Sequence, residues 1–245
     1  MEANALAREP PRAVLHAGAA RPCTDRGWLL SRHSFATDVA AGEGGPRLGP
    51  LRVLNEIRIE RGEGDAARMH QDMEILLWVL DGSLEHQNST GHIAVLEPGD
   101  LARLRAGHGV RHSEYNASGH DPVRLLEFWI QPAERGLAPD FERRRFGPEE
   151  RRGVLRLIAS EDGDAESVQV EQQVRIYAGR FGAAEHGQLP GMAGRAYYAH
   201  CTQGELTVNG CALAAGDGLE LHGVDGIDVS GGSEGELLLF DVPAG

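Results

Sequence analysis

His70 and His112, 42 positions apart, are the centres of two short stretches whose side chains could perform chemistry together. The first stretch also contains Arg68, and the second also contains Glu114. Successive side chains of a β-strand point to opposite faces, so residues 68 and 70 share a face, as do residues 112 and 114. We therefore expect two neighbouring strands to bring all four side chains to one centre.

Two imidazoles and one carboxylate on one side of a metal ion are typical of iron(II) sites that keep positions open for substrate and dioxygen. His70, His112 and Glu114 are thus the candidate ligands, and Fe(II) or another divalent metal is the candidate cofactor. Glu74 shares the face of His70 if the strand continues regularly, which makes it a competing carboxylate. A structural alternative stays open, because a histidine inside a barrel is commonly a hydrogen-bonded core residue.

The elements expected around these residues are short strands. Glycines number 33, and turn residues separate many short apolar segments, so the pattern predicts an all-β protein. Apolar residues alternate with polar ones over most of 51–59. Ile75 to Leu80 is a continuous apolar run, which is typical of a strand buried on both faces.

The second half of the chain repeats the first in outline, which predicts two similar barrels in tandem. Gly82-Ser83-Leu84 followed by Pro98-Gly99-Asp100 corresponds to Gly204-Glu205-Leu206 followed by Ala215-Gly216-Asp217. We expect an N-terminal barrel with the metal site over 13–132, a connector over 133–152 and a C-terminal barrel over 153–245.

Only the first barrel is expected to hold a metal. The positions that correspond to 68, 70, 112 and 114 in the second half have no ligand side chains, being Pro190, Met192, Val229 and Gly231. The remaining histidines are assigned to loops, the surface or packing. We expect His86 and His92 to be exposed beside a hairpin loop, His108 to lie in a loop, and His186, His200 and His222 to be surface or packing residues.

Bulk composition excludes several classes of partner. The net charge of −13 argues against direct nucleic-acid binding, which needs clustered cations. No apolar stretch approaches the roughly 20 residues of a membrane span, and the first residues do not form a signal peptide. Three cysteines with no zinc-like spacing are typical of a reducing compartment. We therefore expect a cytoplasmic protein that does not associate with membranes.

Several long motifs occur in order along the chain, and they identify a family. They are Gly27-Trp28-Leu29 with Ser31-Arg32-His33-Ser34-Phe35, His70-Gln71-Asp72-Met73-Glu74-Ile75, Leu84-Glu85-His86, Pro98-Gly99-Asp100, the eleven residues from Ala106 to Asn116, Thr207-Val208-Asn209-Gly210 and Leu237 to Pro243. In these motifs the chain resembles the pirin family of bicupins, over nearly its whole length from about Val14.

The resemblance implies two tandem cupin (double-stranded β-helix) barrels, iron in the first barrel, and either quercetin 2,3-dioxygenase activity or regulation through a protein partner. The family's ligands are two histidines of a His-x-His pair, then a histidine and a glutamate in a His-Ser-Glu motif. Carried over, these are His70, His112 and Glu114, which favours Glu114 over Glu74. The first histidine of the pair falls on Arg68, so the chain departs from the family at a ligand.

A guanidinium stays protonated and cannot bind iron as an imidazole does. The sequence leaves two outcomes open. In one, Arg68 turns away and a weakened three-ligand site persists. In the other, Arg68 fills the metal position and pairs with Glu114, which would explain a buried carboxylate without a metal.

Two functional hypotheses follow from these outcomes. The first is an iron-dependent dioxygenase with a degraded metal site, acting on a flavonol-like (quercetin-type) or similar aromatic enol substrate, in which Glu114 doubles as the catalytic base. The second is a non-catalytic pirin-like binding or regulatory protein, in which Arg68 replaces the metal and the outer surface meets a protein partner. The residue at position 68 separates the two.

Overall fold

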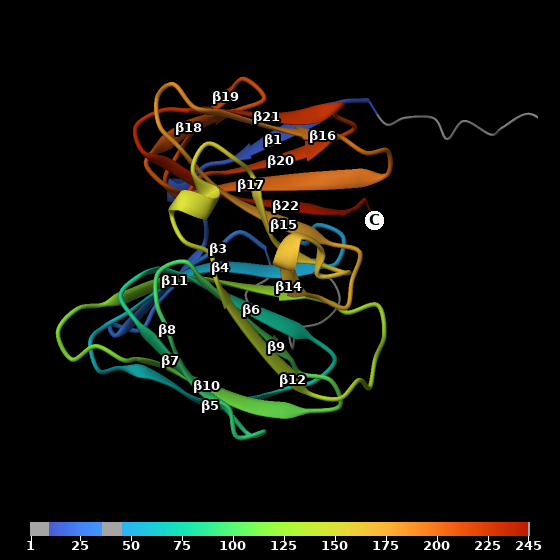
Figure 1. The fold of residues 1–245 in the computed structure, drawn as a ribbon. Coiled ribbons are helices and arrows are strands. Elements are labelled where there is room, and N and C mark those ends of the chain that lie inside the picture. Colours follow the sequence, from blue (N-terminus) through green and yellow to red (C-terminus); the bar gives the residue numbers. More distant parts are fainter. Residues whose placement is uncertain (1–9, 36–45, 245) are drawn as a thin grey trace, which may run out of the picture.

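The computed structural model describes residues 10–35 and 46–244 of the 245-residue chain. Its regular elements are strands apart from the one-turn 3-10 helices η1 (Gly18–Ala20), η3 (Glu149–Arg151) and η4 (Asp164–Glu166), which confirms the all-β prediction. The strands form two barrels, each built from a seven-stranded and a four-stranded sheet (Figure 1). No helix in the described part of the chain is long and apolar enough to cross a membrane.

The first barrel is the lower one in Figure 1. Its larger sheet contains, in spatial order, β12 (Asp140–Arg145), β9 (Asp100–Arg105), β6 (Glu74–Asp81), β11 (Val123–Ile130), β4 (Leu51–Ile59), β3 (Leu29–His33) and β2 (Cys23–Asp25). Its smaller sheet contains β5 (Gly64–His70), β10 (Val110–Asn116), β7 (Leu84–Asn88) and β8 (Ile93–Leu96). All neighbouring strands in both sheets pair antiparallel.

The second barrel repeats this plan. Its larger sheet contains β1 (Arg12–His16), β20 (Gly218–His222), β17 (Arg195–Gln203), β22 (Gly235–Pro243), β15 (Arg175–Phe181), β13 (Arg156–Ser160) and β14 (Val168–Gln169). Its smaller sheet contains β16 (His186–Pro190), β21 (Gly226–Gly231), β18 (Glu205–Val208) and β19 (Cys211–Ala214). Two strands pair differently from what the domain boundaries expected from the sequence would imply. Strand β1 joins this barrel although it begins the chain, and β12, inside the expected connector, pairs with β9 of the first barrel.

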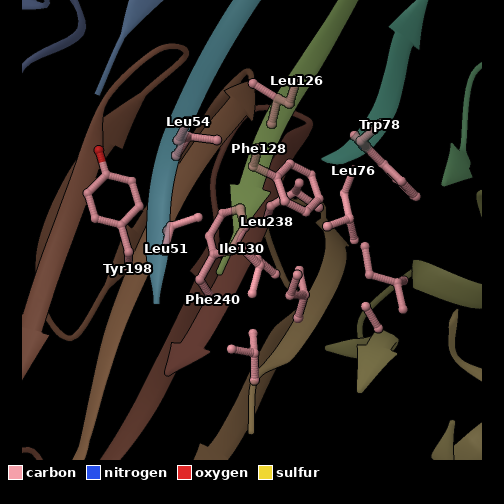
Figure 2. Packing of buried hydrophobic residues seen from close by; sticks show 14 of the residues in the cluster. Leu51, Leu54, Leu76, Trp78, Leu126, Phe128, Ile130, Tyr198, Leu238 and Phe240 are labelled. Carbon is pink, nitrogen blue, oxygen red and sulfur yellow. The ribbon is translucent and has the colours of Figure 1, made fainter. Parts of the chain in front are cut away.

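The two large sheets pack face to face, and the largest apolar cluster of the molecule lies between them. Leucine and aromatic side chains from β4, β6 and β11 meet Tyr198, Leu238 and Phe240 of the second barrel (Figure 2). Strand β6 is buried on both faces, as its apolar run predicts. Trp78 belongs to this cluster, whereas its neighbour Leu77 belongs to the interior of the first barrel.

A buried ionic cluster also joins the barrels. Glu56 of β4 accepts hydrogen bonds from Arg21 at 3.2 Å and Arg124 at 3.0 Å, and it lies 3.8 Å from the imidazole of His200 in β17. Burial alone would raise the pKa of Glu56, but the facing His200, Arg124 and Arg21 outweigh it and lower the pKa to about 2. The carboxylate therefore stabilises the contact between the barrels whenever it is ionised.

Candidate metal and substrate site

Strands β5 and β10 are neighbours in the small sheet of the first barrel, as expected from the spacing of their residues. Arg68 lies opposite His112 in the ladder, and His70 lies opposite Val110. Along β10, Val110, His112 and Glu114 are buried, whereas the residues between them are more exposed. The structure therefore brings Arg68, His70, His112 and Glu114 to one pocket.

This pocket lies between the two sheets of the first barrel and has a volume of about 620 Å³. Cavities of this size hold compact organic ligands. The small sheet contributes the four residues named above. The large sheet contributes an apolar wall formed by Leu29, Ile57, Ile59 and Trp129. It also contributes the polar side chains of Thr24, Ser31, His33, Asn55 and Glu127.

The candidate ligands lie close together. The ring centroids of His70 and His112 are 4.9 Å apart, and Nδ1 of His112 is 3.4 Å from Oε1 of Glu114. That nitrogen and that oxygen are both buried and have no hydrogen-bond partner among the described residues. Buried donors and acceptors without a partner are rare in native proteins, and a bound cation would satisfy them. Their chemistry fits a divalent metal, although no group of three or more His, Cys, Asp or Glu side chains in the described residues is arranged to hold one.

Arg68 forms its ion pair with Asp65 and not with Glu114. From Asp65 to Arg68, β5 has one more residue than the facing part of β10 from His112 to Glu114. This irregularity makes Asp65 the ladder partner of Glu114, and Asp65 lines the same pocket. Nη1 of Arg26 lies 3.9 Å from the same carboxylate. The Arg68 side chain is 51% exposed. Of the two outcomes left open by the sequence, this geometry favours the one in which Arg68 turns away.

Burial dominates the ionisation of the site. It raises the pKa of Glu114 to about 8, helped by repulsion from Glu127 and opposed by the charge of Arg68. Burial also raises the pKa of Glu127. The pKa of His112 is lowered to about 3, first by burial and then by the neighbouring His70. His112 is therefore neutral at physiological pH, and a neutral imidazole is the form that binds a metal.

Glu74 lies outside this pocket. Strand β5 ends at His70, Asp72 adopts a left-handed backbone with φ of +49°, and a new strand begins at Glu74. The regular strand that would have aimed Glu74 at the site is thus interrupted. Its Oε2 instead accepts a hydrogen bond from the backbone N–H of Glu171 at 2.8 Å, and burial raises its pKa to about 7.

The prediction for His86 was wrong. Its side chain is fully buried, its ring centroid lies 5.4 Å from that of His112, and its ring stacks on Phe141. Leu84 and His86 are two positions apart and therefore share the inward face of β7, and this spacing was the sequence signal for the burial of His86.

The other histidines follow the expectations more closely. His92, His108 and His186 are exposed, and His200 is buried, where its imidazole faces Glu56. In the second barrel, Met192 is exposed and Val229 belongs to an apolar core.

Sequence reasoning also missed the polar residues on the opposite wall and at the pocket mouth. Glu127, Asn55 and His33 occupy inward positions of strands whose other inward residues are mostly apolar. An isolated polar residue in such a pattern marks a functional or hydrogen-bonded position, and this was the available signal. Nothing in the alternation predicts the inward orientation of Asp65, because it depends on the irregular register of β5.

Comparisons with known proteins agree with this architecture. The family model described as pirin matches residues 19–130, and the one described as quercetinase C-terminal cupin domain matches residues 157–242. A protein of Escherichia coli strain K12 named quercetin 2,3-dioxygenase is 34% identical over 219 residues, covering 89% of this chain and 94% of its own length. A pirin-like protein of Caulobacter vibrioides is 30% identical over 218 residues, covering 89% and 94%.

Solved structures extend the likeness to three dimensions. The crystal structure of YhhW from Escherichia coli has a TM-score of 0.89 and 33% identity, over 96% of this chain and 99% of that one. The same bacterial pirin in complex with nickel(II) has a TM-score of 0.88 and 33% identity, over 96% and 100%.

Proposed function

Because the chain belongs to the pirin family of two-barrel cupin proteins, we propose that it is a metal-dependent dioxygenase acting on a flavonol-like, quercetin-type substrate. The name of the Escherichia coli relative supports the reaction class, and the nickel(II) complex of YhhW supports the binding of a divalent cation. His70, His112 and Glu114 would hold the ion, with Fe(II) the expected metal. When bound, such an ion supplies Lewis acidity and open positions for substrate and dioxygen.

The orientation of Arg68 carries this proposal. Its guanidinium pairs with Asp65 and is half exposed, which supports a site that stays open for an ion between the candidate ligands. The buried, unpartnered atoms of His112 and Glu114 are then left for another group to satisfy. The site would be weaker than one with four ligands, because one imidazole is lost.

The chain's own residues would bind the substrate and handle its proton. Leu29, Ile57 and Trp129 give the pocket an apolar wall against which an aromatic ring can pack. Glu114 would act as the base that receives the acidic proton of the substrate hydroxyl.

Oxygen uptake with quercetin after anaerobic loading with Fe(II) tests the proposal. We expect turnover in the wild-type protein, loss of most of it in His112→Ala, and no loss in His120→Ala, which removes an exposed imidazole outside the pocket. Equal turnover in the two variants would contradict the assignment of His112.

A second candidate function is a non-catalytic binding protein in which the charge of Arg68 substitutes for that of the metal. The observation in its favour is that no three potential ligands in the described part of the chain are arranged around a common point. In that case the loaded protein should consume no oxygen with quercetin, and Arg68→His should restore metal binding without turnover.

A further inference from the structure

Three polar side chains form a row across the wall of the pocket that faces the candidate ligands. His33 of β3 lies directly opposite Asn55 of β4, and Asn55 lies directly opposite Glu127 of β11. Each is at most 9% exposed. The same strand faces otherwise contribute mainly apolar residues to the barrel interior, among them Leu29, Val53, Ile57 and Leu125. Placing polar groups there is unfavourable unless each is hydrogen-bonded.

The row is continuously hydrogen-bonded. Oγ1 of Thr24 is 3.0 Å from Nε2 of His33, and Nδ1 of His33 is 2.8 Å from Oδ1 of Asn55. The amide nitrogen of Asn55 donates to Oε2 of Glu127 at 3.5 Å. The other carboxylate oxygen, Oε1, accepts a hydrogen bond from the indole Nε1–H of Trp129 at 2.8 Å.

Asn55 presents its NH₂ group to Glu127 and its carbonyl oxygen to His33. Glu127 therefore acts as the hydrogen-bond acceptor at this end of the row. The imidazole of His33 must then carry a proton on Nδ1 in order to donate to that oxygen. In its neutral form, Nε2 accepts the hydroxyl proton of Thr24. Each member of the row therefore depends on Glu127 for its orientation.

The row ends at a candidate metal ligand. The ring of Trp129 meets that of His70 edge to face, with centroids 4.9 Å apart and planes at 81°. Trp129 is 7% exposed, so its indole has little freedom once its N–H is held. The contact ties a residue of the large sheet to a candidate ligand on the small sheet.

We infer that Glu127 is a positioning residue, which holds Trp129 against His70 and thereby sets the orientation of the His70 ring, with Asn55 and His33 holding Glu127 in turn. The inference rests on the proposed function in one respect, namely that His70 is a metal ligand. Residues that contact a metal ligand and fix its orientation typically weaken metal binding by about 10- to 100-fold when they are removed.

Nickel(II) affinity of the full-length protein, measured by competition with a chromophoric chelator, tests the consequence for the metal. We expect Glu127→Ala to weaken Ni(II) binding by about 10- to 100-fold. Trp129→Phe keeps an aromatic ring but loses the N–H donor, and it should weaken binding in the same direction even if Glu127→Ala does not fold. The matched control Glu134→Ala removes an exposed carboxylate outside the pocket and should change nothing. Wild-type affinity in both Glu127→Ala and Trp129→Phe would overturn the inference.

Nuclear magnetic resonance of the metal-free protein tests the row independently of any metal. The ¹⁵N shifts of His33 should show the tautomer protonated on Nδ1 in the wild type. Glu127→Gln places an amide NH₂ group in the row, which should reorient Asn55 and shift His33 towards the Nε2 tautomer. The ring signals of His70 should also move in Glu127→Gln and in Trp129→Phe.

Nickel affinity and the histidine signals together distinguish a failure of the proposed metal function from a failure of the positioning role of Glu127. If the wild type binds no nickel while the His33 and His70 signals respond as described, the row stands and the metal function is wrong. If those signals do not respond to Glu127→Gln, the positioning role is wrong whatever the metal affinity.

Discussion

Replacing Glu74 by glutamine should make the protein more stable at alkaline pH while leaving metal binding unchanged. Glu74 shares a motif with His70 but lies at the contact between the barrels, where the backbone N–H of Glu171 is its hydrogen-bond donor. Its side chain is fully buried, and its other carboxylate oxygen has no hydrogen-bond partner among the described residues. An ionised carboxylate is therefore held there at a cost in free energy.

The magnitude follows from the pKa of Glu74, which is about 7 in the folded protein against 4.5 for the ordinary side chain. Below pH 4.5 the carboxyl is protonated in both the folded and the unfolded state, so it does not affect stability. Between pH 4.5 and 7 only the unfolded state loses the proton, and stability falls as the pH rises. At 1.36 kcal/mol per unit, the loss above pH 7 is about 3 kcal/mol. Glutamine does not titrate and should remove it.

Urea unfolding of wild type and Glu74→Gln at pH 5 and pH 8 measures this difference. Between these two values the variant should gain roughly 2–3 kcal/mol relative to the wild type, because part of the effect is already present at pH 5. Nickel(II) affinity should be equal in the two proteins. A stability difference that does not change with pH would refute the burial argument, and a loss of metal binding would return Glu74 to the list of ligands.

Three further results are expected. Arg68→His should raise metal affinity, measured by chelator competition, because it supplies a neutral imidazole; unchanged affinity would refute the assignment of the site. The pKa of Glu56 is lowered to about 2 with His200 facing it, so its ionised carboxylate stabilises the folded protein. This stabilisation is present above pH 4.5 and is lost as the pH falls towards 2. Glu56→Gln should therefore destabilise the protein by about 3 kcal/mol in urea at pH 7 but by much less near pH 3. Burial raises the pKa of Cys201 to about 12, so this thiol should resist alkylation of the native protein, as seen by mass spectrometry, while the exposed Cys23 reacts.

Much of the fold could be predicted from local pattern. Alternation over 51–59 and the apolar run from Ile75 to Leu80 correspond to β4 and β6 because burial on one or two faces leaves a direct trace in sequence. The pairing of β1 with β20 could not be predicted in this way. It joins residues about 200 positions apart, and no local property of a five-residue strand specifies such a distant partner.

The site was predictable only in part, for a related reason. Spacing placed His70, His112 and Glu114 on two strands, and the structure brings them to one pocket. The partner of Arg68 was missed because Asp65 faces inward only through the irregular register of β5. Glu127 was overlooked because its role depends on Asn55. The two residues are far apart in the sequence and become neighbours only through the pairing of β11 with β4.

Iron content after anaerobic incubation with Fe(II) and desalting tests the central claim most directly. The proposed ligand set predicts close to one iron per chain in the wild type and almost none in His112→Ala. A wild-type protein that retains no iron would contradict the claim and would mean that a site without a fourth ligand at position 68 cannot hold the metal.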